Sequence, residues 1–281
     1  HQGHYPSLNA FGKQFRDNGY QLPGGAEALS RSDRMVEPKQ SRDLTVFKEF
    51  PLAMRGEFFT VAPVAPNETD QPATSYSLFA FLIGGGTVGK DVSYLFTWTP
   101  FPDPSLHQAR IGLHNLFDRK LGAGTLNLRA GSLFLLDFQR PGHRFLSPGA
   151  DDLESVAVGN NSFMFSEANL GVELYGRPMW GPFHYELAMV QGDAPGNIEK
   201  DDWKDLFGRT SVTVFQYTNH EVTPGAFAYV GRSDTETALG DVLLAQRDDF
   251  WIVGGDLEVD VGRFNVSGLG LASRHTDPAY D

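Results

Sequence analysis

Apolar and polar residues alternate along several segments of this chain. The clearest case is residues 91–99, where every second position is apolar and holds Val92, Tyr94, Phe96 or Trp98. The same alternation recurs in residues 183–189 and 256–267, where charged residues occupy many of the intervening positions. A period of two residues is typical of β-strands with two unlike faces. The pattern therefore predicts an all-β protein.

Eleven segments of about ten residues each have the composition and the turn-rich flanks expected of strands. We expect strands at residues 52–61, 76–83, 92–99, 109–116, 125–134, 170–177, 183–190, 209–217, 226–232, 250–260 and 263–272. The expected long loops are residues 138–168, 191–204 and 234–247, and the expected tight turns lie near residues 178–182 and Gly262. Short turns at one end of a sheet and long loops at the other are typical of outer-membrane barrels.

Two architectures fit this alternation. In a soluble sandwich the apolar face packs on a second sheet, whereas in a transmembrane barrel it faces lipid and the polar face lines a wet lumen. The strand count and the unequal loops favour an antiparallel transmembrane β-barrel of about 12–16 strands in residues 42–281. Bacterial barrels have an even number of strands, so either a strand has been missed or the barrel is incomplete at the C-terminus. Residues 274–281 look like the opening of another loop, which favours incompleteness.

Residues 1–41 differ from the rest of the chain. Leu8, Phe11 and Phe15 fall on one face of a short predicted helix, and Asn18 followed by Gly19 provides a left-handed stop. The polar residues that follow contain few side chains able to build a core. We therefore expect a short N-terminal helical plug with a linker, seated in the mouth or lumen of the barrel.

Composition narrows the function further. The chain has 281 residues, a net charge of −12 and no cysteine, and its lysine and arginine residues form no cluster in the sequence. Nucleic-acid binding is therefore not expected, because binding to phosphates relies on clustered basic residues. No apolar stretch reaches the roughly 18 residues that a spanning helix requires. A membrane barrel stays compatible with this composition, because its strands need only every second residue to be apolar.

The polar positions of the predicted strands supply the candidate lumen-lining residues. They are Arg55, Glu57, Arg110, His114, Arg129, Glu173, Arg177, His184, Glu186, Arg209, Glu258 and Arg263. If the apolar faces meet lipid, these side chains would pair across the interior, because an isolated charge in a narrow lumen is costly. In a soluble sheet the same residues would be solvated surface charges. His114, His184 and Glu186 would alternatively form a pH-sensitive cluster.

Enzyme motifs are scarce. The glycine-rich residues 84–90 are expected to be a turn and not a phosphate loop, because no helix follows them. No G-x-S-x-G or H-E-x-x-H motif and no nucleophilic cysteine is present, so hydrolase or transferase activity is not expected. At the N-terminus, His1 and His4 are a candidate copper site, since a terminal amine and imidazole groups can chelate this metal together. A frayed terminus is the alternative.

The first twenty residues carry a more specific signal. They resemble the segment that follows the haem-attachment motif in outer-membrane proteins that fuse a monohaem cytochrome c domain to a porin-like barrel, a family that includes iron-oxidising cytochromes. The matching positions are Pro6, Leu8, Asn9, Phe11, Gly12, Phe15, Asn18, Gly19 and Tyr20. The later segments 77–98, 171–175 and 268–271 look similar to the barrel of this family in pattern.

The resemblance implies that His1 is the histidine of the attachment motif and the proximal haem ligand. The cofactor-binding residues that it implies are His1, Pro6, Leu8, Phe11 and Phe15. Haem c is expected only if the attachment cysteines precede His1, because neither is present in this sequence, and otherwise no cofactor is expected. Met35 and Met54 are the candidates for a distal ligand.

The sequence thus predicts an outer-membrane, porin-like barrel that transfers electrons across the outer membrane, in extracellular electron transfer or iron oxidation. Its expected partners are outer-membrane lipid and a periplasmic or extracellular electron-transfer cytochrome. Two alternatives stay open. One is a haem-free porin or structural scaffold, and the other is a soluble β-protein that binds a ligand.

Overall fold

The computed structural model describes residues 52–61, 75–88, 91–101, 105–122, 124–136, 155–158, 161–165, 169–178, 181–192, 203–217, 220–239, 242–262 and 264–277. These residues are strands and short connections, apart from the four-residue helix α3 (Asp118–Leu121). No helix in these ranges is long and apolar enough to cross a membrane. The helix predicted within residues 1–41 lies outside the described residues.

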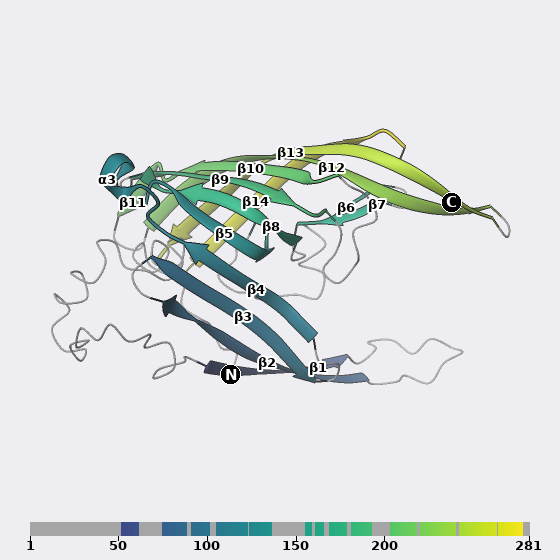
Figure 1. Ribbon diagram of the computed structural model, residues 1–281, viewed down its shortest axis with the longest axis horizontal. Coiled ribbons are helices and arrows are strands. Elements are labelled where there is room, and N and C mark those ends of the chain that lie inside the picture. Colours follow the sequence, from purple (N-terminus) through teal and green to yellow (C-terminus); the bar gives the residue numbers. More distant parts are fainter. Residues whose placement is uncertain are drawn as a thin grey trace.

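Twelve strands of the described part form one antiparallel sheet (Figure 1). They are β1 Leu52–Val61, β2 Ser75–Val88, β3 Val92–Phe101, β4 Ser105–Leu113, β5 Asn127–Leu133, β8 Asn169–Gly176, β9 Phe183–Val190, β10 Asp205–Val212, β11 Phe215–Tyr217, β12 His220–Leu239, β13 Val242–Val261 and β14 Phe264–His275. Their order is β1-β2-β3-β4-β5-β8-β9-β10-β12-β13-β14, and β11 pairs with β12 beside this path. The predicted all-β antiparallel fold is confirmed. Within the described residues, however, the sheet is open, with β1 and β14 at its edges.

The β12–β13 hairpin is longer than its neighbours. Each strand has twenty residues, and the two pair along their whole length. β10 pairs with β12 only over residues 225–230, and β14 pairs with β13 only over residues 250–261. One end of the hairpin therefore projects beyond the sheet, as Figure 1 shows. The predicted long loop at residues 234–247 was wrong, because mutual backbone pairing holds most of this segment in two strands.

Two further predictions need correction. The expected loop 138–168 contains β6 (Ser155–Val158) and β7 (Asn161–Met164), which pair as a separate hairpin.

The glycine-rich run expected to be a turn lies partly inside β2, where Gly84, Gly85 and Gly86 pair with residues of β3. A Cβ atom at Gly84 would collide with the ring of Phe96. Gly84 therefore allows a close approach between β2 and β3, a known role of glycine in sheets.

The two faces of the sheet differ sharply in burial. On β9, for example, the side chains of His184 and Glu186 are buried, whereas those of Leu187 and Met189 are exposed. We call the face with the buried side chains the inner face and the opposite one the outer face. The main hydrophobic cluster also lies on the inner face, where the β6–β7 hairpin packs Phe163 against β12 and β13.

Candidate functional site: the two faces of the sheet and their rim

Five charged residues form a row across the inner face. Strand alternation places Arg129 on β5, Glu173 on β8, Glu186 on β9, Arg209 on β10 and Asp256 on β13. Arg129 is directly opposite Glu173 in the β5–β8 pairing, and Arg209 is opposite Glu186 in the β9–β10 pairing. Directly opposed residues on neighbouring strands are close enough for their side chains to interact. Each of these two pairings therefore sets an arginine against a carboxylate, while Glu173 and Glu186 also contact each other.

Two bidentate ion pairs hold this row together. The guanidinium of Arg129 donates from Nε and Nη2 to the two carboxylate oxygens of Glu173, with an Nη2–Oε1 distance of 3.0 Å, and Nη2 lies 3.6 Å from Glu186. Arg209 donates from Nε and Nη2 to Asp256 at 2.9 and 2.7 Å. The Arg209 side chain is 4% exposed and that of Asp256 is 0% exposed. These charges are desolvated, so each depends on its partner.

A glycine makes the second pair possible. Arg209 and Asp256 come from strands that are not neighbours, because β12 lies between them. Gly225 of β12 is opposite Asp256 in the register, and a Cβ atom there would lie 2.5 Å from the Asp256 carboxylate. The absent side chain therefore lets the carboxylate reach across β12 to the guanidinium.

His114 is held by two hydroxyl groups beside the charged row. Its Nε2 atom lies 2.6 Å from Oγ of Ser93 and its Nδ1 atom lies 3.1 Å from the hydroxyl of Tyr175. The Tyr175 ring in turn lies 5.0 Å from the guanidinium carbon of Arg129. A serine and a histidine at this distance match the geometry of an activated nucleophile. Ser93 is only 7% exposed and His114 only 2% exposed, so no substrate reaches them and we assign the contacts a structural role.

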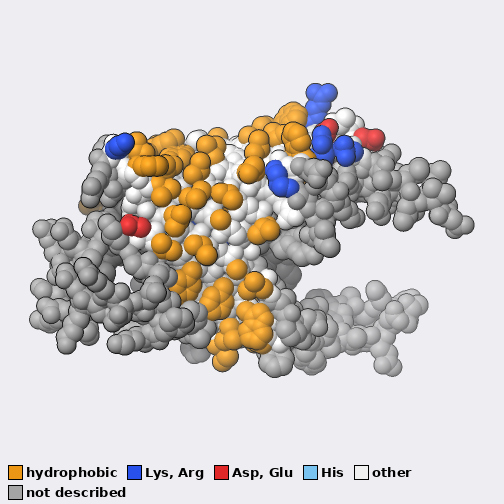
Figure 2. Space-filling view, in the orientation of Figure 1, with side chains coloured by type: hydrophobic (Ala, Val, Ile, Leu, Met, Phe, Trp, Pro, Cys, Tyr) orange, Lys and Arg blue, Asp and Glu red, His pale blue; other side chains and the backbone are white. Residues whose placement is uncertain are grey.

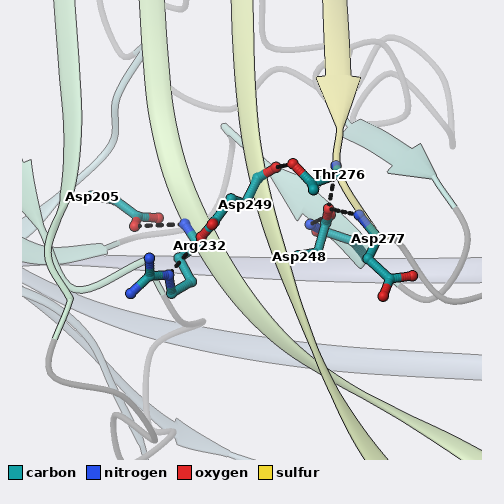
Figure 3. A network of polar contacts seen from close by, with 7 residues as sticks. Asp205, Arg232, Asp248, Asp249, Thr276 and Asp277 are labelled. Carbon is teal, nitrogen blue, oxygen red and sulfur yellow. Dashed lines mark hydrogen bonds and ion pairs between the residues drawn. The ribbon is translucent and has the colours of Figure 1, made fainter.

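Asp248 lies at the end of the sheet from which the β12–β13 hairpin projects, where it connects three elements (Figure 3). Its carboxylate accepts hydrogen bonds from Asn161 of β7 at 2.7 Å and from the backbone N–H groups of Thr276 and Asp277 at 3.0 and 3.1 Å, and it lies 2.6 Å from Nδ1 of His275. Burial alone would raise the pKa of this carboxyl. The hydrogen bonds outweigh burial and hold its pKa below the ordinary value of 3.8.

A second contact chain lies at the same end (Figure 3). The backbone N–H of Arg232 donates to Asp205 at 3.0 Å, and its side-chain Nε donates to Asp249 at 2.6 Å. The guanidinium carbon of Arg232 lies 4.7 Å from the ring centre of Trp203. Asp249 is 57% exposed, so this pair is in contact with solvent, unlike the two pairs of the inner row.

The outer face is apolar over most of its extent. Figure 2 shows hydrophobic side chains across one view of the sheet, with most of the visible charged side chains gathered toward the projecting hairpin. Exposed large hydrophobic residues on this face include Ile111, Leu113, Leu170, Val172, Leu174, Leu187, Met189, Leu206, Val230, Val253, Leu257, Val261 and Val266. Such an area is far beyond the isolated exposed hydrophobic residues of an ordinary soluble surface.

Exposed aromatic residues mark both ends of this apolar area. Trp203 and Trp251 lie at the end of the sheet from which the β12–β13 hairpin projects. Phe183, Phe215 and Phe264 lie at the other end, near the paired ends of β9 and β10 and of β13 and β14. The outer face is therefore an aliphatic band between two rows of aromatic side chains.

The structure distributes the predicted lumen-lining residues as follows. His114, Arg129, Glu173, His184, Glu186 and Arg209 carry their side chains on the inner side, and all are buried or nearly so. Arg110, Arg177 and Glu258 are partly buried. Arg55 and Glu57 belong to β1, but their side chains, like all of Arg263, lie outside the described residues. The predicted pH-sensitive cluster does not form around His114, whose ring nitrogens contact Ser93 and Tyr175 instead.

Sequence reasoning missed several members of these sites. Asp256 stands in the same alternation as Glu258, so the period of two contained the signal for it. Asp248 and Asp249 fell next to a predicted loop, and only the long β12–β13 pairing places them on a strand. Gly225 follows a proline, a pair typical of turns, and nothing local indicates its place beneath a carboxylate.

The haem c prediction was wrong. A c-type haem is attached through cysteine thiols, and this chain has no cysteine. The residues named for the cofactor and for a copper site, His1, His4, Pro6, Leu8, Phe11 and Phe15, lie outside the described residues, as does Met35. Met54 is on β1 and is 80% exposed, so no described residue holds it against a cofactor. Within the described residues, His, Asp and Glu side chains form no group able to hold a metal ion.

No protein-family model, no curated protein and no solved structure matches this chain. Its function must therefore be inferred from the inner face, the outer face and the polar contacts at the end of the sheet from which the β12–β13 hairpin projects.

Proposed function

We propose that this chain forms the wall of an outer-membrane, porin-like β-barrel that carries no haem. The observation that supports this most directly is the inversion of the two faces of the sheet. The inner face buries Arg129, Glu173, Glu186, Arg209 and Asp256, while large hydrophobic residues point outward. The inner face thus carries paired charges beside its hydrophobic cluster, while the outer face is apolar. An apolar outer face is what a bilayer demands of a barrel wall, and the reverse of what water demands.

The height of the apolar band supports the same assignment. On β13 the band extends from Trp251 to Val261, a separation of ten residues. At about 3.3 Å per residue this is roughly 33 Å along the strand, and at the usual tilt of about 40° it corresponds to roughly 25 Å along the membrane normal. Outer-membrane barrels carry an apolar band of about 25 Å between two aromatic girdles.

The charge pairing of the inner face is consistent with a narrow, protein-filled interior. Each arginine of the row has a carboxylate within hydrogen-bond distance, which offsets part of the cost of removing both charges from bulk water. The β6–β7 hairpin packs on the same face and would narrow the interior of the proposed barrel further. We therefore place the β6–β7 hairpin inside the proposed barrel.

The soluble sandwich is the rival architecture, and the position of the core argues against it. A sandwich buries the apolar face of its sheet under a second sheet. In the described residues the only second sheet is the β6–β7 hairpin, and its aromatic residues pack on the inner face and not on the outer one. Transfer of electrons with a partner cytochrome stays a prediction from the sequence.

The test is an arginine scan of the outer face. Leu257 is near the middle of the band and 44% exposed, and Val261 is at its end and 51% exposed. In phosphatidylcholine vesicles, Leu257→Arg should lower the free energy of unfolding by about 2–4 kcal/mol, whereas the matched Val261→Arg should cost about 0–1 kcal/mol, because its side chain can reach the headgroups. In water both changes would cost within about 0.5 kcal/mol. Equal small costs, or a stable monomer in detergent-free buffer, would refute the membrane proposal.

A further inference from the structure

Glu186 is a third carboxyl group in a row that has two guanidinium groups. Each guanidinium already forms a bidentate pair with another carboxylate, Arg129 with Glu173 and Arg209 with Asp256. Glu186 lies 3.6 Å from Nη2 of Arg129 and is opposite Arg209 in the β9–β10 register. Both cations near Glu186 are therefore bound more closely by a different carboxylate.

The carboxyl groups of Glu173 and Glu186 meet across the neighbouring strands β8 and β9. The same atom, Nη2 of Arg129, lies 3.0 Å from an oxygen of Glu173 and 3.6 Å from an oxygen of Glu186. The two carboxyl groups are also within hydrogen-bonding contact of each other. An ionised carboxylate only accepts hydrogen bonds, so a bond between two carboxyl groups requires that one of them carries a proton.

Burial makes the alternative, two ionised carboxylates in contact, costly. The side chains of Glu173 and Glu186 are each only 3% exposed, so water screens their repulsion poorly. Two carboxyl groups in such a position share one proton, because like charges in contact cannot both be ionised at low cost.

Other charged and titratable side chains surround this pair on the inner face. Two cations act on Glu186, and these are Arg129 and Arg209. The ring nitrogens of His114 contact Ser93 and Tyr175 and neither glutamate. Among the described residues, the full set of charged and titratable neighbours is Arg110 on β4, His114 after it, Arg129 on β5, Tyr175 on β8, His184 on β9, Arg209 on β10, and Asp256 and Glu258 on β13.

We propose that Glu173 and Glu186 hold one exchangeable proton between them, and that this proton keeps the two ion pairs of the inner row in contact. With the proton in place, one carboxyl group donates to the other across β8 and β9. Its loss at high pH would leave two negative charges in contact and push the two strands' side chains apart. The inner face is thus a pH-sensitive element, built from Glu186 and Glu173 and not from the histidines. This inference goes beyond the proposed membrane wall and does not depend on it.

Infrared spectroscopy detects such a proton directly. The C=O stretching band of a protonated carboxylic acid is separate from the bands of a carboxylate, and at pH 7 exposed Asp and Glu side chains are ionised. The protein is folded in phosphatidylcholine vesicles, or in detergent-free buffer if the membrane proposal fails, and the spectrum of each variant is subtracted from that of the parent protein.

Two glutamine variants and one control identify the band. The difference spectra for Glu173→Gln and for Glu186→Gln should both show the loss of one protonated carboxyl group, because either change leaves a single carboxylate beside Arg129. Asp249→Asn should show no such loss, because it removes a carboxylate that also pairs with an arginine but is 57% exposed.

Urea unfolding at a series of pH values gives a second measurement. Above about pH 5 the glutamates of an unfolded chain are ionised, so a folded state that keeps one more proton loses stability as pH rises. The unfolding equilibrium constant of the parent protein should rise about tenfold per pH unit relative to that of Glu186→Gln, until the folded pair releases its proton. Asp249→Asn should follow the parent protein.

Each other outcome overturns the shared proton. Difference spectra without a protonated carboxyl group, together with an unfolding ratio that does not change with pH, would show that both glutamates are ionised. A band that disappears with Glu186→Gln but stays with Glu173→Gln would show that burial alone protonates Glu186. If the band is absent and stability depends on whether sodium or potassium is present, the row binds a cation in place of the proton. The arginine scan of the outer face decides the membrane wall separately.

Discussion

Replacing Asp256 with asparagine would remove the carboxylate on which the buried guanidinium of Arg209 depends. Both side chains are almost fully buried, and the pair is bidentate at 2.7 and 2.9 Å. Asparagine keeps the size and one acceptor oxygen but removes the charge. The variant therefore isolates electrostatics from packing.

The expected cost follows from the surroundings of the pair. Breaking a buried ion pair by removing one partner typically costs 3–5 kcal/mol, since the remaining charge stays desolvated. Arg209 keeps Glu186 opposite it on β9, so we expect the lower end of this range, about 3 kcal/mol. With a urea dependence of about 3 kcal/mol per molar, the unfolding midpoint should fall by about 1 M.

The assay is equilibrium urea unfolding in vesicles, followed by tryptophan fluorescence. Asp249→Asn is the matched control, because Asp249 also pairs with an arginine, at 2.6 Å, but is 57% exposed. That variant should cost less than about 1 kcal/mol. If the two variants cost the same small amount, water reaches the inner row freely, and the assignment of a desolvated, charge-paired interior is refuted.

Three further outcomes follow from the same contacts. Gly225→Ala should cost about 2–3 kcal/mol in urea unfolding by displacing the Asp256 carboxylate, whereas Gly268→Ala, where nothing lies within 4 Å of the added atom, should be close to neutral. Phe163→Ala should lower the free energy of unfolding by about 3–5 kcal/mol and loosen the β6–β7 hairpin, which would be detected as faster proteolysis. An unchanged rate of proteolysis would contradict the packing of Phe163. The pKa of Asp248 is lower in the folded protein than in the unfolded chain, so its carboxylate contributes stability above about pH 4 that is lost as pH falls through the lower, folded pKa. The difference in unfolding free energy between the parent protein and Asp248→Asn should therefore shrink on acidification. A difference that does not change with pH would contradict the role of the carboxylate.

The parts of the fold that sequence predicts are those set by local periodicity. β9 is the clearest case, because apolar and polar residues alternate from Phe183 to Leu187 and the predicted strand 183–190 has the same limits as β9. The alternation also identified which residues share a face, so Glu186 and Leu187 were correctly assigned to opposite faces. Backbone geometry enforces this separation wherever a strand forms, which is why it needs no knowledge of neighbours.

The parts that sequence did not predict depend on partners far along the chain. Residues 234–247 show no regular alternation of apolar and polar side chains, and their strand geometry comes from pairing within the β12–β13 hairpin. Arg129 and Glu173 are separated by 44 positions in the sequence. Their contact requires β5 to pair with β8, although the β6–β7 hairpin lies between these strands in the sequence. The reach of Asp256 across β12 requires both a strand order and a glycine, neither of which one segment can encode.

The backbone groups at the two edges of the sheet bear on the membrane proposal. β14 has twelve residues, so about six N–H and six C=O groups point toward its free side. In lipid each unpaired group costs at least about 2 kcal/mol, and even six of them would consume most of the 5–15 kcal/mol by which proteins are typically stable. In water the edges would be solvated, but the apolar outer face would then be exposed. Under the membrane proposal the outer face would contact lipid and the edge strands would need partners, and a closed wall in which both β1 and β14 are paired would satisfy the two conditions together.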